Sequence, residues 1–371
     1  MQCRITFSAL DIQRPTIFLD QSKALHNLHR MVEKAKSNNL LLRPHFKTHQ
    51  SAALGRWFSQ SGIRQITVSS VKMAQYFANA GWDDITIAFP VNILEWDSIV
   101  TLARRIRIQV VVSSPHVIEE LPASDVPIGV FVKLDVGTHR TGFDPANRVV
   151  LERVVKQIRQ RSDLELKGFL AHAGHSYSCR DRSCIQRVHD ESKKIMLDVK
   201  SVYSEQIPQL VISVGDTPTC SVAEDWSGID EIRPGNFIFY DLTQLKIGAC
   251  SLEDIAVVLA CPVVAKHDQR KTIVVYGGGI HLSKEGLPWG GKTIYGLPVE
   301  LDGMTWSMPD EYSHVMSLSQ EHGIIQASER LYDRVGLGDL LGILPVHSCM
   351  TCDLMKSYTL SDQSVKSMMP V

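Results

Sequence analysis

Five short segments concentrate side chains that can hold an anionic cofactor, form a covalent bond or ligate a metal ion. In chain order they are Arg43–His49 (RPHFKTH), Lys133–Gly142 (KLDVGTHRTG), His172–Tyr177 (HAGHSY), Ser213–Thr219 (SVGDTPT) and Pro345–Cys352 (PVHSCMTC). Each of the first four follows an apolar run that predicts a β-strand. The active sites of α/β barrels lie where the parallel strands end, so these four segments are candidates for such a site.

Lys47 is the candidate nucleophile of the first segment. A lysine at a strand end can form a Schiff base with an aldehyde cofactor. A partly buried position near other cations lowers the pKa of its amine and makes the amine nucleophilic. For this segment taken alone, a solvated loop is an equally good interpretation.

The next two segments suggest contacts to a bound ring. Glycines in Lys133–Gly142 permit a tight turn, so Arg140 can point into the barrel mouth and bind an anionic oxygen. Two histidines and Tyr177 at the following strand end suggest contacts to an aromatic ring. A structural turn and a satisfied polar cluster are the alternatives.

The segment Ser213–Thr219 has the composition of a phosphate-binding loop. Gly215 and Thr217 offer backbone N–H groups and a hydroxyl at a strand-to-helix turn, where barrels commonly bind phosphate. The carboxylate of Asp216 is unfavourable beside a dianion, so we expect its side chain to point away. An ordinary turn is the alternative.

His347 and Cys349 form a candidate metal pair. On an extended strand residues i and i+2 share a face, so the two side chains can chelate one ion, and a nitrogen–sulfur pair suits zinc. Cys349 and Cys352 form a CxxC, but no second CxxC completes a structural zinc site. A buried, inert histidine and cysteine is the alternative.

Alternating apolar runs and helical patterns predict the elements that position these segments. Strands are predicted at Thr16–Asp20, Leu40–Leu42, Ile66–Val68, Ile85–Phe89, Ile108–Val112, Ile128–Leu134, Leu166–Ala171 and Leu210–Val214. Helical spacing lies between most of them, for example at Asp144–Gln160 and Asp190–Tyr203. About eight such units favour an α/β fold of the (β/α)8 TIM-like barrel type over a doubly wound sheet.

The pattern changes after about Asp241. Strand-like runs at Ile255–Leu259, Val263–Ala265 and Thr272–Tyr276 follow without long helices, and turn signals separate later segments. We therefore expect a cofactor-binding barrel over residues 13–245. A mostly antiparallel β-domain over residues 246–371 would carry the metal pair, and residues 1–12 are expected to pack on it.

Composition excludes several classes of protein. The 371 residues are 44% hydrophobic and 21% charged, as in ordinary globular proteins, and 39 basic against 40 acidic residues argue against a nucleic-acid partner. No run approaches 18 apolar residues and Met1–Leu10 lacks a signal-peptide pattern, so we expect no membrane span and a cytoplasmic protein. The 8 cysteines are scattered along a long chain, which favours free thiols or metal ligands over disulfides.

Seven motifs, in order, resemble the D-serine dehydratase and D-threonine aldolase group of fold-type III, alanine-racemase-like pyridoxal-phosphate enzymes. They are RPHFKTH, KLDVGTHRTG, HAGHSY, SVGDTPT, EIRPGNFIFYD (Glu231–Asp241), SQEHG (Ser319–Gly323) and PVHSC. The resemblance spans the chain from about Pro15 to Cys349. It implies a (β/α)8 barrel followed by a β-domain, with pyridoxal 5'-phosphate and zinc as cofactors, a small-molecule substrate and a homodimer.

The resemblance also implies a role for each candidate site residue. Lys47 would carry the cofactor as a Schiff base, Arg140 would lie near its phenolic oxygen, and Tyr177 would contact its pyridine nitrogen. The implied phosphate loop is Gly215, Asp216 and Thr217 with Tyr240 nearby, and the implied metal pair is His347 and Cys349. Aldolases of the group carry His-x-Asp at this pair and dehydratases carry His-x-Cys, so Cys349 favours a dehydratase.

The implied reaction is zinc-assisted loss of water from a D-3-hydroxy amino acid, as in D-serine dehydratase (D-serine ammonia-lyase). It gives a keto acid, pyruvate in the case of D-serine, and ammonia. The alternatives are retro-aldol cleavage as in D-threonine aldolase, an amino-acid racemase, and a non-catalytic cofactor-binding protein. Racemisation has no use for a metal pair, and the non-catalytic proteins are single barrels. The sequence leaves open whether the substrate is D-serine, D-threonine or D-3-hydroxyaspartate.

Overall fold

The computed structural model describes residues 12–308 and 312–370. Contacts divide these residues into a barrel unit (residues 28–237 and 247–249) and a β-unit (residues 12–27, 238–246 and 250–370). These bounds differ from the expected division at residues 245 and 246. The expectation for residues 1–12 falls on positions that, apart from residue 12, lie outside the described ranges. None of the described helices is both long enough and apolar enough to cross a membrane.

Eight parallel strands form the barrel unit, in the spatial order β2-β9-β8-β7-β6-β5-β4-β3. Their bounds are β2 Leu41–Leu42, β3 Ile66–Val68, β4 Asp84–Pro90, β5 Arg107–Val112, β6 Ile128–Leu134, β7 Leu164–Ala171, β8 Val211–Val214 and β9 Glu231–Ile232. The two ends of this order meet, because the N–H of Phe46 donates to the carbonyl of Thr67 (2.8 Å) and the N–H of Thr67 donates to that of Pro44 (2.9 Å). The predicted TIM-like barrel is therefore confirmed.

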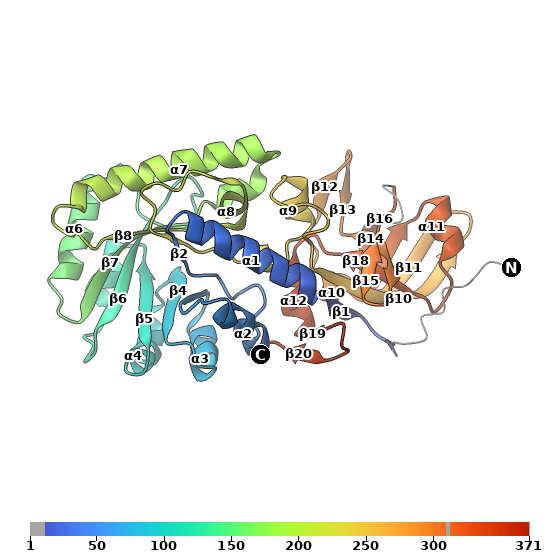
Figure 1. The fold of residues 1–371 in the computed structure, drawn as a ribbon, viewed down its shortest axis with the longest axis horizontal. Helices are drawn as coiled ribbons and strands as arrows, with labels where there is room; N and C mark the ends of the chain where they lie inside the picture. The colour runs from blue at the N-terminus through green and yellow to red at the C-terminus, as the bar shows by residue number, and fades with distance from the viewer. Residues whose placement is uncertain (1–11, 309–311, 371) are drawn as a thin grey trace. The chain divides into compact units, whose positions relative to one another are not determined.

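Helices alternate with these strands. They are α2 Ala52–Gln60, α3 Val71–Asn79, α4 Trp96–Ala103, α5 Pro115–Glu120, α6 Arg148–Arg159, α7 Arg182–Tyr203 and α8 Thr217–Val222, while α1 Gln21–Ser37 runs from the β-unit into the barrel unit. Figure 1 shows α3, α4, α6 and α7 around the barrel strands. Helix α6 shows why such segments form helices with one buried face. Its apolar residues recur at helical spacing and are all buried: Leu151, Val154, Val155 and Ile158.

One predicted barrel strand belongs to the β-unit instead. Thr16–Leu19 (β1) pairs antiparallel with β10 and parallel with β19. The eighth barrel strand is β9, which lies between β8 and β2. Sequence analysis missed β9 because it has only two residues, one of them the buried Glu231, and so gives no apolar run.

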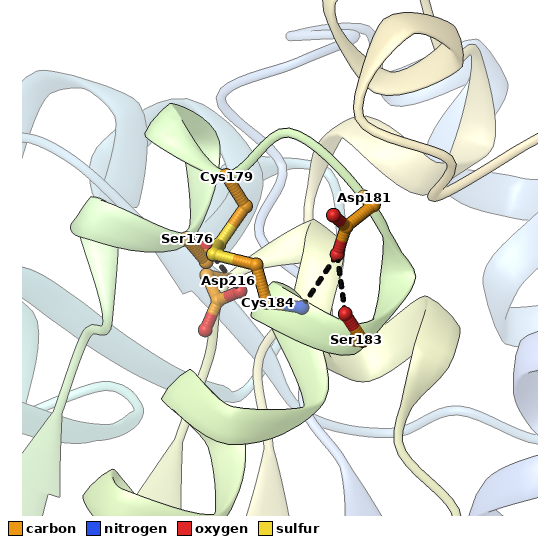
Figure 2. Close-up of a disulfide and its surroundings, with 6 residues drawn as sticks. All are labelled: Ser176, Cys179, Asp181, Ser183, Cys184 and Asp216. Carbon is orange, nitrogen blue, oxygen red and sulfur yellow. Dashed lines mark hydrogen bonds between the residues drawn. A yellow bond between two sulfur atoms is a disulfide. The ribbon is translucent and has the colours of Figure 1, made fainter.

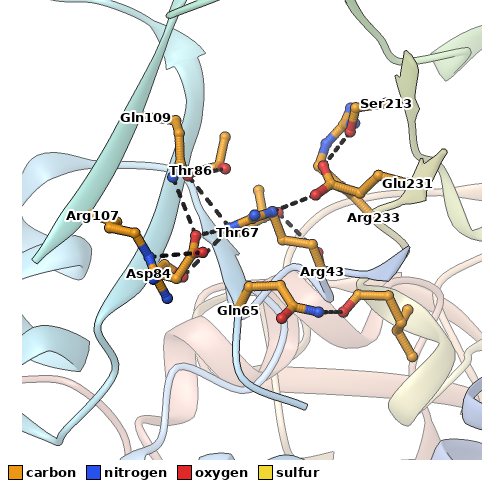
Figure 3. A network of polar contacts seen from close by, with 11 residues as sticks. Arg43, Gln65, Thr67, Asp84, Thr86, Arg107, Gln109, Ser213, Glu231 and Arg233 are labelled. Atoms are coloured by element: carbon orange, nitrogen blue, oxygen red, sulfur yellow. Dashed lines mark hydrogen bonds and ion pairs between the residues drawn. The ribbon is translucent and has the colours of Figure 1, made fainter. Parts of the chain in front are cut away.

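A network of buried charges fills part of the barrel interior (Figure 3). Arg43, just after β2, donates to Glu231 (2.6 Å) and to Asp84 (2.5 Å). Ser213 donates to Glu231 and accepts a hydrogen bond from Arg233. Each buried charge thus has a partner, which offsets the cost of removing it from water.

Mostly antiparallel strands form the β-unit, as predicted. The main order is β15-β14-β18-β10-β1-β19-β20, with β11, β17 and β16 continuing from β10. The bounds are β10 Val257–His267, β11 Thr272–Tyr276, β12 Leu287–Trp289, β13 Lys292–Ile294, β14 Leu297–Asp302, β15 Thr305–Ser307, β16 His314–Leu318, β17 His322–Gln326, β18 Leu340–Leu344, β19 Ser357–Thr359 and β20 Val365–Ser367. Short helices accompany them: α9 Leu242–Lys246, α10 Gly279–Leu282, α11 Glu329–Arg334 and α12 Ser348–Met355.

Candidate active site

Lys47 lies in the turn that follows β2 and is exposed. Its backbone N–H points to Nδ1 of His45 at 3.3 Å. The four basic-type side chains of this segment do not gather in one place. Arg43 is buried in the interior network, and His49 is buried against the rings of Phe46 and Phe58. Only His45 and Lys47 of the four therefore remain as candidates to meet a ligand.

Basic-type side chains from four strand ends influence one another electrostatically at the barrel mouth. Burial and, to a smaller extent, the charges of Lys47, Arg140 and Arg233 together lower the pKa of His172 to about 3. Burial, with the charges of Lys47, Arg233 and His172, also holds the pKa of His45 well below its usual range. Both imidazoles are therefore neutral, and the charge of this group resides on the lysine and the arginines.

A second lysine faces the same group of cations. Burial lowers the pKa of Lys133, at the end of β6, to about 8, and Arg140 and Arg233 contribute in the same direction. Its ammonium donates to the hydroxyl of Thr141 at 2.5 Å. This concentration of cations attracts an anionic ligand, since charges of the same sign lie near one another and two of them, on Lys133 and Arg233, are buried.

The loop after β8 combines a close backbone approach with an unused hydroxyl. A Cβ on Gly215 would lie 2.7 Å from the Cβ of Arg233, so only glycine fits there. The backbone N–H of Thr217 points to the Tyr177 hydroxyl at 3.3 Å. The Thr217 hydroxyl is buried and has no hydrogen-bond partner among the described residues. A buried hydroxyl without a partner is costly, which favours a ligand at this position.

Asp216 is buried, and its carboxylate is held by neighbouring groups of the protein. Its carboxylate caps α8 by accepting from the backbone N–H of Thr219 (2.8 Å) and from the hydroxyl of the same residue (2.7 Å). It also accepts from Ser176 at 2.8 Å. Burial raises the pKa of Asp216 to about 6.

A disulfide lies beside the turn that carries Tyr177 (Figure 2). Cys179 and Cys184 are bonded to each other, so the preference for free thiols or metal ligands is wrong for these two cysteines. Their separation of five residues brings the end of the turn Gly174–Ser178 to the first turn of α7. Asp181 lies between them and caps α7 by accepting from the N–H of Cys184 at 2.8 Å.

In the β-unit, His347 and Cys349 are neighbours, but not on a strand. His347 is the residue that precedes α12, and Cys349 lies in the first turn of that helix. The prediction of an extended strand is therefore wrong. The side chains still meet: although burial acts in the opposite direction, hydrogen bonds with Cys349 and Glu285 raise the pKa of His347 to about 11. The described residues contain no group of three or more histidine, cysteine or acidic side chains arranged to hold a metal.

Tyr240 also lies in the β-unit, where it is buried and has a left-handed backbone (φ 49°). Its proposed nearness to the phosphate loop stays a prediction. Sequence analysis did not single out Arg233, Lys133 or Glu285 as site residues. A signal existed for Arg233, because an arginine directly after a barrel strand and before Pro234-Gly235 is unusual for a solvated loop.

Comparison with known proteins identifies the fold family. The family model described as "Alanine racemase, N-terminal domain" matches residues 19–242, more than half of the chain. The chain belongs to the alanine racemase N-terminal domain family. In this member of the family a second domain follows, because residues 256–361 match the model described as "Putative serine dehydratase domain".

Relatives of this alanine-racemase-like chain include three lyases. D-threo-3-hydroxyaspartate dehydratase from Delftia sp. is 27% identical, with 92% of each chain covered. D-serine dehydratase from Dictyostelium discoideum is 27% identical, covering 94% of this chain and 93% of the relative. D-threonine aldolase from Arthrobacter sp. is 24% identical, covering 92% of this chain and 87% of the relative. The solved structure of the Delftia enzyme superimposes with a TM-score of 0.87 at 24% identity, covering 96% of this chain and 98% of that one.

These findings establish an enzyme of the pyridoxal-phosphate-dependent lyase class, and the alanine-racemase-like dehydratase family implies pyridoxal phosphate as the cofactor. The residues of the barrel unit fit such a group. Lys47 offers an amine, Arg140 and Arg233 offer positive charge, and the loop at Gly215–Thr217 offers a close backbone approach and the unpartnered hydroxyl.

Proposed function

We propose that this lyase is a D-serine dehydratase or a close relative, which eliminates water from a D-3-hydroxy amino acid and yields a keto acid and ammonia. The observation that carries the choice of reaction is the contact between His347 and Cys349. A nitrogen and a sulfur donor side by side suit zinc. A racemase has no need of such a pair, and the aldolases of this group carry an aspartate at the position of Cys349.

The barrel residues would have two roles, which are to bind the cofactor and to remove the Cα proton of the substrate. Bound pyridoxal phosphate would supply an electron sink for the electron pair at Cα. Lys47 would hold the cofactor through its amine and would be the base that takes the Cα proton of the substrate. The guanidinium of Arg140 would bind an anionic oxygen of the ring, and the loop at Gly215–Thr217 would bind the phosphate. Neutral His172 donates through Nδ1 to the carbonyl of Gly215, which supports the shape of that loop.

Departure of the hydroxyl group explains the need for a metal. Hydroxide is a poor leaving group, and a Lewis acid stabilises it as it leaves. His347 and Cys349 would hold a zinc ion with open positions for substrate oxygens, since two protein donors fill only half of a tetrahedral shell.

The test is the product spectrum of the purified enzyme supplied with pyridoxal phosphate and zinc. D-serine and D-threo-3-hydroxyaspartate are each expected to give ammonia and a keto acid, while L-serine gives neither. Release of glycine and an aldehyde from D-threonine, with no ammonia from D-serine, would assign the chain to the aldolases. Conversion of D-serine to L-serine alone would assign it to the racemases.

A further inference from the structure

We propose that Glu285 is a positioning residue for the metal site: it holds the Nδ1–H of His347 and so presents Nε2 of that ring to a divalent cation. This inference rests on the proposed function, because it assumes that His347 is a ligand. Oε2 of Glu285 lies 2.7 Å from Nδ1 of His347. No role for Glu285 follows from the motifs of the sequence.

The geometry of this pair fixes the ring nitrogen that is left for a metal. A carboxylate only accepts hydrogen bonds, so Nδ1 must carry the proton in this contact. With Nδ1 engaged by the carboxylate, Nε2 is the ring nitrogen that remains for a metal ion, which would replace any proton there. Such carboxylate–imidazole pairs orient metal-ligating histidines and raise their basicity.

Both sides of the pair are anchored to the same helix. On the side of His347, Asp241 accepts from the backbone N–H of Ser348 at 3.0 Å and so caps α12. On the side of Glu285, the hydroxyl of Thr351 in α12 donates to the carbonyl of Leu282 in α10, three residues before Glu285 (3.2 Å). Helix α12 is therefore bonded both next to His347 and to the segment that leads to Glu285.

The motif Ser319–Gly323, which the catalytic roles leave unused, packs on the turn Gly277–Gly279 that leads into α10. The backbone N–H of Gly279, the first residue of α10, donates to the carbonyl of Ser319 (2.8 Å), and that of Gly277 donates to Glu321 (2.9 Å). A Cβ on Gly278 would lie 2.3 Å from the carbonyl oxygen of Gln320, so the loop packs directly on this motif. The motif thus has a structural role at the start of α10, the helix whose last residue, Leu282, is bonded to α12.

The experiment measures metal binding rather than turnover. Metal-free protein that retains pyridoxal phosphate in the barrel is titrated with Co²⁺. The thiolate-to-cobalt charge-transfer band reports binding of the metal to Cys349. We expect Glu285→Ala to weaken Co²⁺ binding by about 10- to 100-fold, and Glu285→Gln, which keeps an acceptor oxygen, to weaken it less. Glu321→Gln is the matched control, because Glu321 forms a looser pair with His281 (3.9 Å) in the same unit.

The outcomes separate this inference from the proposed function. If the unmodified protein gives the thiolate band and Glu285→Ala binds Co²⁺ with the same affinity, Glu285 does not position His347 and the metal site itself stands. If the unmodified protein gives no thiolate band, the metal assignment fails and the inference fails with it. Unchanged far-ultraviolet circular dichroism and thermal unfolding of Glu285→Ala guard against a folding defect.

Discussion

The hydroxyl of Ser176 donates a 2.8 Å hydrogen bond to the carboxylate of Asp216 and so joins two loops of the barrel that lie 40 residues apart in the sequence. One of these loops carries Tyr177 and the other carries Thr217, and the two residues meet through the hydroxyl of Tyr177. The disulfide between Cys179 and Cys184 closes the same turn from the other side (Figure 2). Both loops are expected to shift together.

Removal of this link should loosen the phosphate loop. Ser176→Ala leaves Asp216 with fewer partners, so we expect a loss of about 1 kcal/mol in the free energy of unfolding and weaker pyridoxal-phosphate binding. Urea denaturation and equilibrium dialysis of the cofactor measure the two effects. Ser178→Ala is the control, because Ser178 belongs to the same turn but is exposed. Equal cofactor affinity in both variants would contradict a role for the link.

Thr217→Val should separate ligand binding from stability. The hydroxyl of Thr217 has no partner among the described residues, so its loss should leave the unfolding free energy nearly unchanged. Cofactor affinity should fall about tenfold, because one hydrogen bond to a charged group is lost. Thr219→Val makes a contrast, since the Thr219 hydroxyl donates to Asp216 and its loss should lower stability. A stability loss in Thr217→Val without any loss of affinity would refute the phosphate-loop assignment.

Lys47 should be the residue that carries the cofactor. Borohydride reduction of the holoenzyme followed by peptide mapping is expected to place the label on Lys47, and Lys47→Ala should abolish turnover. Lys133 is the informative comparison, because burial lowers its pKa to about 8 and makes it the other reactive amine of the barrel mouth. A label on Lys133 would sink the assignment.

Cys349 should matter more than Cys352. Cys349→Ala removes a thiolate donor and should lower zinc affinity at least tenfold, whereas Cys352 is fully buried, and burial raises the pKa of its thiol so that it stays protonated. Metal analysis of the dialysed variants measures this difference.

Removal of the metal from the unmodified enzyme with a chelator tests whether the metal assists departure of the leaving group. It should abolish elimination from D-serine but spare D-β-chloroalanine, because chloride leaves without acid help. Equal loss of both activities would mean that the metal orients the substrate instead.

Acid should destabilise the barrel unit through its buried neutral histidines. Burial lowers the pKa of His49 to about 3, against 6.5 in an unfolded chain. The unfolded state therefore binds the extra proton first, so stability is complete above about pH 6.5 and is lost as the pH falls toward about 3. The slope is at most about 1.4 kcal/mol per pH unit for each such histidine.

Urea denaturation at several pH values tests this linkage. His49→Gln, which can still accept the N–H of Ser51, should show a shallower loss of stability on acidification. His116→Gln serves as the control, because the side chain of His116 is 79% exposed. If His49→Gln retains the full slope, the acid sensitivity has another source.

The barrel, the β-domain and the order of the site segments follow from local patterns in the amino-acid sequence. A strand such as Ile128–Leu134 is buried along its whole length, so it can be predicted from a local run of apolar residues. Lys47, Arg140 and the loop at Gly215–Thr217 come after β2, β6 and β8 in the chain, and strand ends in a barrel converge whatever the details of packing.

Features that depend on pairing between distant segments emerge only in the folded chain. The strand β1 has the same apolar character as a barrel strand, and its partner β10, more than 200 residues later, assigns it to the β-unit. From the sequence, Arg43 and His49 are candidate site residues. In the folded chain, Arg43 instead pairs with Glu231 in the interior, and His49 packs against phenylalanine rings. Glu285 meets His347 across 62 residues through the packing of α10 on α12. Such contacts have no local signature, because their energy comes from burial and charge pairing that exist only once the chain has folded.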